Sequence, residues 1–320
     1  MKNEEFAAAK MISRTEAMTR KMEAFTDAGL YEQDEFIDFL PEGHIYLYRS
    51  KERRREGVEE RRREGVEEGR REGVEERRLL PVSNLVGYFF EPFDGRRAAL
   101  RRQERYGIPV EQTLREWRRG GCMASEVGTF LHEQTENYFR DGRFETRYVF
   151  RFEGESEEIS VEPERRHFMR FVTDHHIRPY RQEWPVYDVD LNVAGTIDMI
   201  CREDDGEFII YDWKRSRKVV DDQGRPIVTA YGGKMSLNGI SVPDTAYCHY
   251  CLQQNLYRYM LQQNYGIRVK ALNLVVLCAD YDNYRLVPVP LLDDVVARIV
   301  SICKERDLGH NLLQGSRSEE

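Results

Sequence analysis

The chain has 320 residues and a formal net charge of −8, and 40% of its residues are hydrophobic and 33% charged. This length suits one large or two modest α/β domains with a highly charged surface. No apolar run reaches about 18 residues, so we expect no transmembrane helix and no membrane partner. The N-terminus lacks a secretory layout, and the six cysteines form no disulfide framework. We therefore expect an intracellular protein with reduced thiols. Viral, bacterial cytoplasmic and organellar settings are the alternatives for its location.

An octapeptide repeat dominates the N-terminal region. A helix is predicted at residues 4–27, and short strands are predicted at 44–48 and 79–82. Between these strands, residues 53–76 hold three copies of a unit that ends R-R-E-G-V-E-E. Each unit has a single apolar residue and a glycine that weakens a helix, so the segment cannot build a core. We predict an exposed low-complexity insertion, either a frayed helix or disordered.

Arginines cluster just after this insertion, in a chain that is acidic on average. The cluster consists of Arg96, Arg97, Arg101, Arg102, Arg105, Arg115, Arg118 and Arg119, with Tyr106 and Trp117 among them. Arginines with interleaved aromatic residues can contact phosphates and stack on bases. The alternative is an ordinary solvated helix face. The acidic net charge does not exclude a positive groove, because physiological salt screens charges beyond about 8 Å.

The rest of the chain alternates between helical and extended patterns. Helices are predicted at 121–140, 161–179 and 245–265 and from residue 293, and strands at 183–189, 192–201, 207–214, 268–277 and 284–289. This order predicts an α/β fold in which a mixed central β-sheet is flanked by helices. We expect an accessory region at 1–120, a core domain at 121–290, and a C-terminal helix and tail at 291–320.

Two carboxylates and a lysine lie on two neighbouring predicted strands. Asp198 lies within the first strand, and Asp212 and Lys214 lie within the second, where period 2 directs both to one face and Trp213 to the other. If residues 203–206 form a hairpin turn, Asp198 comes level with Asp212. Such a group suits a hard divalent cation with a lysine beside a reacting phosphate. The alternative is a surface ion pair on an edge strand.

Four motifs in this order resemble the PD-(D/E)XK nuclease superfamily, and within it the RecB-type branch with its viral and mitochondrial single-strand exonucleases. They are Gly128-x-x-x-His132-x-x-x-Glu136, Gly195-x-x-Asp198, Asp212-x-Lys214 and Gln253-x-x-x-Tyr257. The likeness covers about residues 120 to 290. It implies a restriction-endonuclease-like core preceded by a helical N-terminal extension.

The resemblance also implies roles for individual residues. His132, Asp198 and Asp212 would bind Mg²⁺ or Mn²⁺, together with the backbone carbonyl of Trp213. Lys214 would orient or activate the attacking water and stabilise the charge that the phosphate gains. An oxygen-rich ligand set with one imidazole suits these metals, and a lysine supplies a compact charge.

Three further residues receive less direct roles from the resemblance. Gln253 and Tyr257 share one face of a helix, and they would brace Lys214 or contact the DNA strand. Glu183 would add a carboxylate behind the metal ligands or at a second metal.

The resulting expectation is a metal-dependent DNA nuclease, and more narrowly an exonuclease on DNA ends or single strands in replication, recombination or repair. The alternatives are a catalytically silent nucleic-acid-binding scaffold on the same fold and a restriction-type endonuclease. The chain contains no P-loop motif, so a separate helicase or another replication or recombination protein would have to supply any ATP-driven unwinding.

Overall fold

The computed structural model describes residues 31–40, 43–51, 74–230 and 233–315. The predicted helix at 4–27, and with it the helical N-terminal extension, lies outside the described residues. So does most of the repeat. The last three residues of the repeat, 74–76, belong to strand β3, so the segment between the two strands ends earlier than the repeat does.

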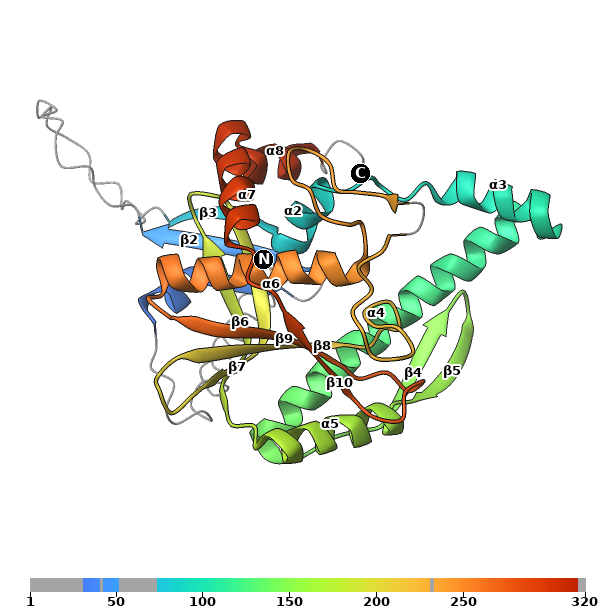
Figure 1. Cartoon of the computed structure of the whole chain (residues 1–320), viewed down its shortest axis with the longest axis horizontal. Helices are drawn as coiled ribbons and strands as arrows, with labels where there is room; N and C mark the ends of the chain where they lie inside the picture. The colour runs from blue at the N-terminus through green and yellow to red at the C-terminus, as the bar shows by residue number, and fades with distance from the viewer. Residues whose placement is uncertain (1–30, 41–42, 52–73, 231–232, 316–320) are drawn as a thin grey trace, which may run out of the picture.

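A large mixed β-sheet forms the centre of the molecule (Figure 1). Its strands are β1 (Ile37–Leu40), β2 (Ile45–Lys51), β3 (Val74–Pro81), β6 (Pro179–Asp188), β7 (Val193–Arg202), β8 (Phe208–Lys214), β9 (Val269–Val276) and β10 (Arg285–Val289). They follow the order β1-β2-β3-β7-β8-β9-β10, and β6 pairs with β7. The β3–β7 and β8–β9 pairs are parallel and the other pairs are antiparallel. The predicted mixed sheet is confirmed.

Helices cover both faces of this sheet. They are α2 (Val82–Tyr88), α3 (Gly95–Tyr106), α4 (Val110–Asp141), α5 (Glu162–His175), α6 (Ala246–Asn264), α7 (Asp293–Arg306) and α8 (Leu308–Gly315), with a short 3-10 helix η1 (Glu32–Phe36) before β1. The prediction of one C-terminal helix is incomplete, because Asp307 adopts a left-handed backbone with φ of 45° and separates α7 from α8. Within the described residues, no helix combines the length and apolar character needed to cross a bilayer.

Helix α4 is longer than its sequence pattern predicts. It begins at Val110, directly after Pro109, rather than at residue 121, and so it continues through Gly120 and Gly121. The adjacent glycines each cost about 1 kcal/mol in a helix, but the strongly helix-forming residues around them carry the helix across. The same helix crosses the expected domain boundary between residues 120 and 121, and that division of the chain stays a prediction.

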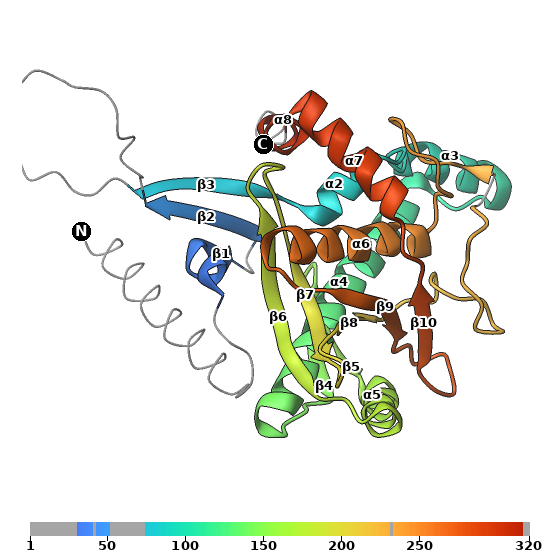
Figure 2. The ribbon, with the colours of Figure 1, turned by 60° about the vertical axis from the view of Figure 1, so that its left-hand side comes forward.

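A hairpin that the sequence analysis did not anticipate follows α4. Strands β4 (Arg147–Phe152) and β5 (Glu155–Ser160) form a separate two-stranded sheet beside that helix. Figure 2 shows the other departure from a simple layered shape, which is the extension of β2 and β3 beyond the main body on the side of β1.

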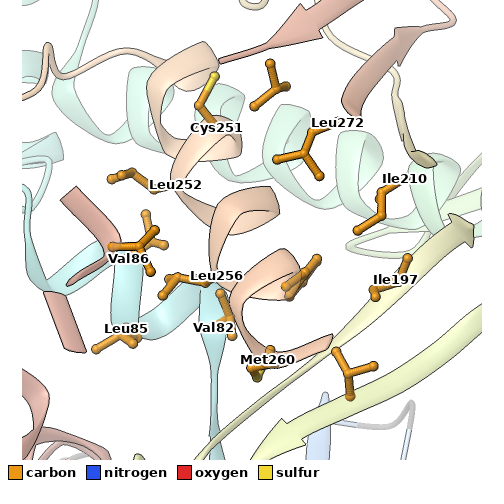
Figure 3. Packing of buried hydrophobic residues seen from close by; sticks show 14 of the residues in the cluster. Val82, Leu85, Val86, Ile197, Ile210, Cys251, Leu252, Leu256, Met260 and Leu272 are labelled. Atoms are coloured by element: carbon orange, nitrogen blue, oxygen red, sulfur yellow. The ribbon is translucent and has the colours of Figure 1, made fainter. Parts of the chain in front are cut away.

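The main hydrophobic core fills the space between α6 and the sheet. Apolar residues of α6 face strand residues such as Ile197, Ile210 and Leu272, and α2 packs at the side of the same helix (Figure 3). On the opposite face, Leu131 of α4 and aromatic residues of α5 pack against Trp213. The end of β8 therefore lies between two cores, and α4 and α6 approach it from opposite sides.

Candidate metal centre

The β7–β8 hairpin brings Asp198 level with Asp212. Its antiparallel ladder ends with Met199 opposite Tyr211, so the same register places Asp198 opposite Asp212. Beyond the last ladder pair, the Asp198 side chain replaces the backbone partner, because the Trp213 N–H donates to Oδ2 of Asp198 at 2.8 Å. The predicted hairpin is confirmed, and its end is held by one of the two carboxylates.

The alternation along β8 also follows the prediction. Trp213 is buried against Phe168 and Phe171 of α5, with ring centroids 5.5 and 5.6 Å away. Asp212 and Lys214 turn to the other side and form an ion pair with each other. The apolar anchor between them therefore fixes the direction of both polar side chains.

His132 extends from α4 toward the end of this hairpin. Its Nε2–H donates a hydrogen bond of 3.2 Å to the backbone carbonyl of Trp213. In the neutral imidazole with this hydrogen bond, Nδ1 carries the lone pair, and it lies 3.5 Å from Oδ2 of Asp198 and 3.8 Å from Oε1 of Glu183. The carbonyl that the resemblance makes a metal ligand accepts this hydrogen bond, which orients the imidazole so that Nδ1 faces two carboxylates.

Glu183 lies in β6 at the point where the chain leaves regular strand geometry. Its neighbours Gln182 and Trp184 pair with Met199 and Ile197 of β7, but Glu183 itself has a φ of 43°. A left-handed backbone costs a residue with a side chain roughly 1 kcal/mol or more, and such outliers gather at functional sites. Strand β6 pairs with β7 along the edge opposite to β8, and from there the Glu183 carboxylate reaches the His132 imidazole.

Ligand atoms of His132, Glu183 and Asp198 all lie within 4.8 Å of one another. The three residues come from α4, β6 and β7, which are distant in sequence. Glu183, for which the resemblance suggested a secondary position, therefore belongs to the group that the structure brings together most closely. Asp212 lies deeper, beside this group.

Asp212 and Lys214 form the buried part of the site. Burial raises the pKa of the Asp212 carboxyl to about 6, although the neighbouring ammonium lowers it. Burial alone would lower the pKa of Lys214, but the charges of Asp212 and Asp198 raise it above its ordinary value. Lys214 therefore stays a cation, and it holds a carboxylate that is only 1% exposed.

Tyr250 is a site residue that the motifs did not reveal. The Lys214 ammonium lies 4.5 Å from the centroid of the Tyr250 ring, which is within the range of a cation–π contact. Tyr250 stands on α6, and its position three residues before Gln253 directs it to the same face of the helix. That spacing is the only sequence signal for it.

Gln253 and Tyr257 are hydrogen-bonded to each other. Gln253 Nε2 donates to the Tyr257 hydroxyl at 2.7 Å, and Tyr257 is buried over the backbone of Gly195 in β7. A Cβ atom at Gly195 would lie 2.3 Å from Cε1 of Tyr257. The glycine three residues before Asp198 is therefore required by the close approach of α6, and the pair fixes where β7 lies relative to that helix.

A second tyrosine, Tyr46 of β2, lies next to the site, and the sequence analysis did not identify it either. Its hydroxyl lies 2.9 Å from Oγ1 of Thr196. Burial raises its pKa, and the nearby charges of Glu183 and Asp198 add to that increase. Its strand was predicted, but nothing in a single strand indicates which distant residues it will adjoin.

Comparisons with known proteins add little to this geometry. No protein-family model matches the chain, and no curated protein matches it. Thirteen chains of solved structures do match. One of these, titled "Crystal structure of SSO0001", is 15% identical over 70% of this chain and 74% of its own, with a TM-score of 0.29. A TM-score this low supports no conclusion about the fold or function of this chain.

Proposed function

We propose that this protein is a metal-dependent nuclease that hydrolyses phosphodiester bonds in DNA, acting on ends or single strands. We further propose that its sheet and helices form a restriction-endonuclease-like core. The observation that carries the proposal is the convergence of His132, Glu183 and Asp198 next to the ion pair of Asp212 with Lys214. Carboxylates, an imidazole and a lysine are residue types that suit phosphodiester hydrolysis with a divalent cation.

The side chains present fit a divalent cation. With the Nε2 proton of His132 donated to a carbonyl, Nδ1 of the neutral imidazole is an acceptor, and it faces two carboxylate oxygens at 3.5 and 3.8 Å. Three acceptors that point at one another favour a cation among them. Carboxylates with one imidazole suit Mg²⁺ or, better, Mn²⁺.

His132, Glu183 and Asp198 would hold the cation, with Asp212 added from the neighbouring strand. A cation bound there would neutralise charge on the phosphate and make a water molecule more acidic. Trp213 contributes through its backbone, because its N–H fixes Asp198 and its carbonyl fixes His132.

Lys214 would carry the charge that the phosphate gains during hydrolysis. Its position at the end of β8 puts an ammonium beside the carboxylates, and its raised pKa keeps it protonated at neutral pH. A fixed positive charge in a water-poor site stabilises a developing anion more strongly than it would in water. Lys214 therefore binds and orients the phosphate, and we do not assign it the role of a base.

The experiment is a time course of hydrolysis by the full chain on end-labelled linear single-stranded DNA. We expect degradation with Mn²⁺ or Mg²⁺ and none in EDTA. Lys214→Ala should abolish hydrolysis while DNA binding persists. The matched control is Lys270→Ala, because Lys270 lies near the opposite end of the neighbouring strand β9, paired with Asp205, and this variant should keep full activity.

Two results would contradict the proposal at different levels. Undiminished hydrolysis by Lys214→Ala would remove the lysine from the mechanism. Absence of hydrolysis of single-stranded, duplex and circular DNA by the unaltered protein with either metal would overturn the assigned activity. Labels at the 5′ and 3′ ends, together with circular substrates, establish whether cleavage begins at an end and at which one.

A further inference from the structure

Helix α3 and the first turns of α4 form an arm that leads away from the sheet (Figure 1). The arm is joined internally, since Nη1 of Arg102 on α3 contacts Oε2 of Glu116 on α4 at 2.8 Å. His132 lies on the same α4 helix, sixteen residues after Glu116. At 1.5 Å per residue, Glu116 lies about 24 Å from His132 along the axis of α4, so the arm begins about that far from the candidate metal centre.

The arginine cluster seen in the sequence divides into two sets in this arm. The arginines of α4 face the acidic strand β5 and the turn before it, so acidic side chains neutralise them. The pairs are Arg115 with Glu153 at 2.6 Å and with Glu155 at 3.5 Å, Arg118 with Glu153 at 3.9 Å, and Arg119 with Glu157. These α4 arginines therefore form an ordinary solvated helix face, which was the alternative to a phosphate-binding surface.

The arginines of α3 are arranged differently. Arg97, Arg101 and Arg105 recur every four residues, so they form one row along the helix, and all three are exposed. Within the part of the chain that the structure describes, none of the three has an acidic group within ion-pair distance. The whole helix contains five arginines and one glutamate, so it carries a strong local positive charge on an acidic protein.

Exposed aromatic side chains accompany this row. Phe93, just before α3, is 74% exposed, and Tyr106, at its end, is 63% exposed. Trp117 of α4 is 37% exposed and meets Phe93 edge to face, with ring centroids 5.7 Å apart. Exposed rings of this kind stack on unpaired bases, whereas paired bases in a duplex offer no open face along the helix.

We propose that α3 is a docking surface for a single DNA strand, with the Arg97, Arg101 and Arg105 row binding its phosphates on an arm that begins about 24 Å from His132 along α4. The proposal rests on the proposed nuclease function for its occupant. At the 3.4 Å rise per nucleotide of stacked DNA, this distance corresponds to about seven nucleotides. A strand much shorter than that cannot reach both places, so the surface acts only on longer strands.

The experiment compares two double variants of the full chain that each remove two arginines. Arg97→Ala with Arg101→Ala removes charge from the row. Arg202→Ala with Arg268→Ala is the matched control, because both residues are exposed at the opposite end of the sheet from Lys214. Binding of fluorescent oligothymidylate of about 25 nucleotides, well beyond the seven-nucleotide reach, is measured by anisotropy in EDTA over a series of salt concentrations. Thermal unfolding checks that both variants fold.

Loss of two phosphate contacts should reduce the slope of log K against log salt by about 1.4, because each contact to a single strand contributes about 0.7. The control should keep the slope of the unaltered protein. Hydrolysis of an oligonucleotide of about four nucleotides, which is too short to span the distance, should be unchanged in both variants.

An unchanged salt slope in the Arg97→Ala, Arg101→Ala variant would overturn the docking surface, whatever the protein hydrolyses. The readout is independent of catalysis. If the slope falls as expected but no DNA is hydrolysed with any metal, then the surface stands and the proposed activity fails. If hydrolysis occurs and the slope does not fall, then the activity stands and the surface fails.

Discussion

Gly195→Ala is predicted to destabilise the protein through a single contact. The added Cβ would lie 2.3 Å from Cε1 of Tyr257 and 2.9 Å from its Cζ and hydroxyl oxygen, whereas carbon atoms pack at about 3.5 to 4.0 Å. Tyr257 cannot swing aside easily, because it is 3% exposed and its hydroxyl is held by Gln253. Overpacking of this kind costs roughly 1–3 kcal/mol.

The assay is urea unfolding of the metal-free chain. Gly87→Ala is the matched control, because Gly87 also lies in a regular element, α2, but has nothing within 4 Å of the new Cβ. It should raise the free energy of unfolding by up to about 1 kcal/mol, since alanine favours a helix.

A double-mutant cycle isolates the contact. In a Tyr257→Ala background the Gly195→Ala change should cost almost nothing, which would give a coupling energy of about 1–3 kcal/mol. If Gly195→Ala is as stable as the unaltered protein, or if its cost is the same with and without the tyrosine ring, the account of why this glycine precedes Asp198 is wrong.

Three further predictions concern the site and its support. Because the pKa of Asp212 is about 6 without metal and binding needs the ionised form, apparent Mn²⁺ affinity measured by calorimetry should fall about tenfold from pH 7 to pH 5; affinity that is constant over this range would contradict the assignment. Tyr250→Phe should keep hydrolysis, whereas Tyr250→Leu should lower kcat about fivefold with KM unchanged, because only the phenylalanine ring preserves the contact with Lys214, worth about 1 kcal/mol; equal activity of the two variants would refute it. Arg215→Ala should reduce the free energy of unfolding in urea by roughly 3–5 kcal/mol, because it leaves the wholly buried Glu164 carboxylate without its partner at 2.8 Å; a loss under about 1 kcal/mol would show that the carboxylate finds another partner.

The part of the site that the sequence predicted depends on local periodicity. Alternation along β8 directs Asp212 and Lys214 to one side and Trp213 to the other, and a turn of the right length brings Asp198 level with them. These relations need only the pleat of a strand and the register of a hairpin. The mixed sheet flanked by helices follows from the same patterns, read over longer windows.

The rest of the site depends on contacts between distant segments. Glu183 is itself a left-handed residue inside a strand, and its carboxylate lies near the imidazole. No pattern in the sequence indicates this backbone conformation or this contact. The role of Tyr250 follows from how α6 lies over β8. No periodicity expresses these relations, because the packing of whole elements creates them.

Strand β5 illustrates the same limit at the level of the fold. Its sequence, Glu155–Ser160, is half glutamate and has no apolar alternation, so a propensity analysis does not indicate a strand. It forms because β4 supplies its backbone partners and because the arginines of α4 neutralise its acidic side chains. The length of α4 is explained in the same way, since its N-terminal half has partners that the sequence alone does not reveal.

A calorimetric titration of the full chain with Mn²⁺ at pH 7.5 tests the central claim most directly. We expect tight binding at the site in the unaltered protein, and its loss in Asp198→Asn and in His132→Ala, because both side chains face the same point between α4 and β7. Glu133→Gln, on the exposed side of the same helix, should bind as the unaltered protein does. Equal Mn²⁺ binding by Asp198→Asn, His132→Ala and the unaltered chain would show that these residues hold no cation.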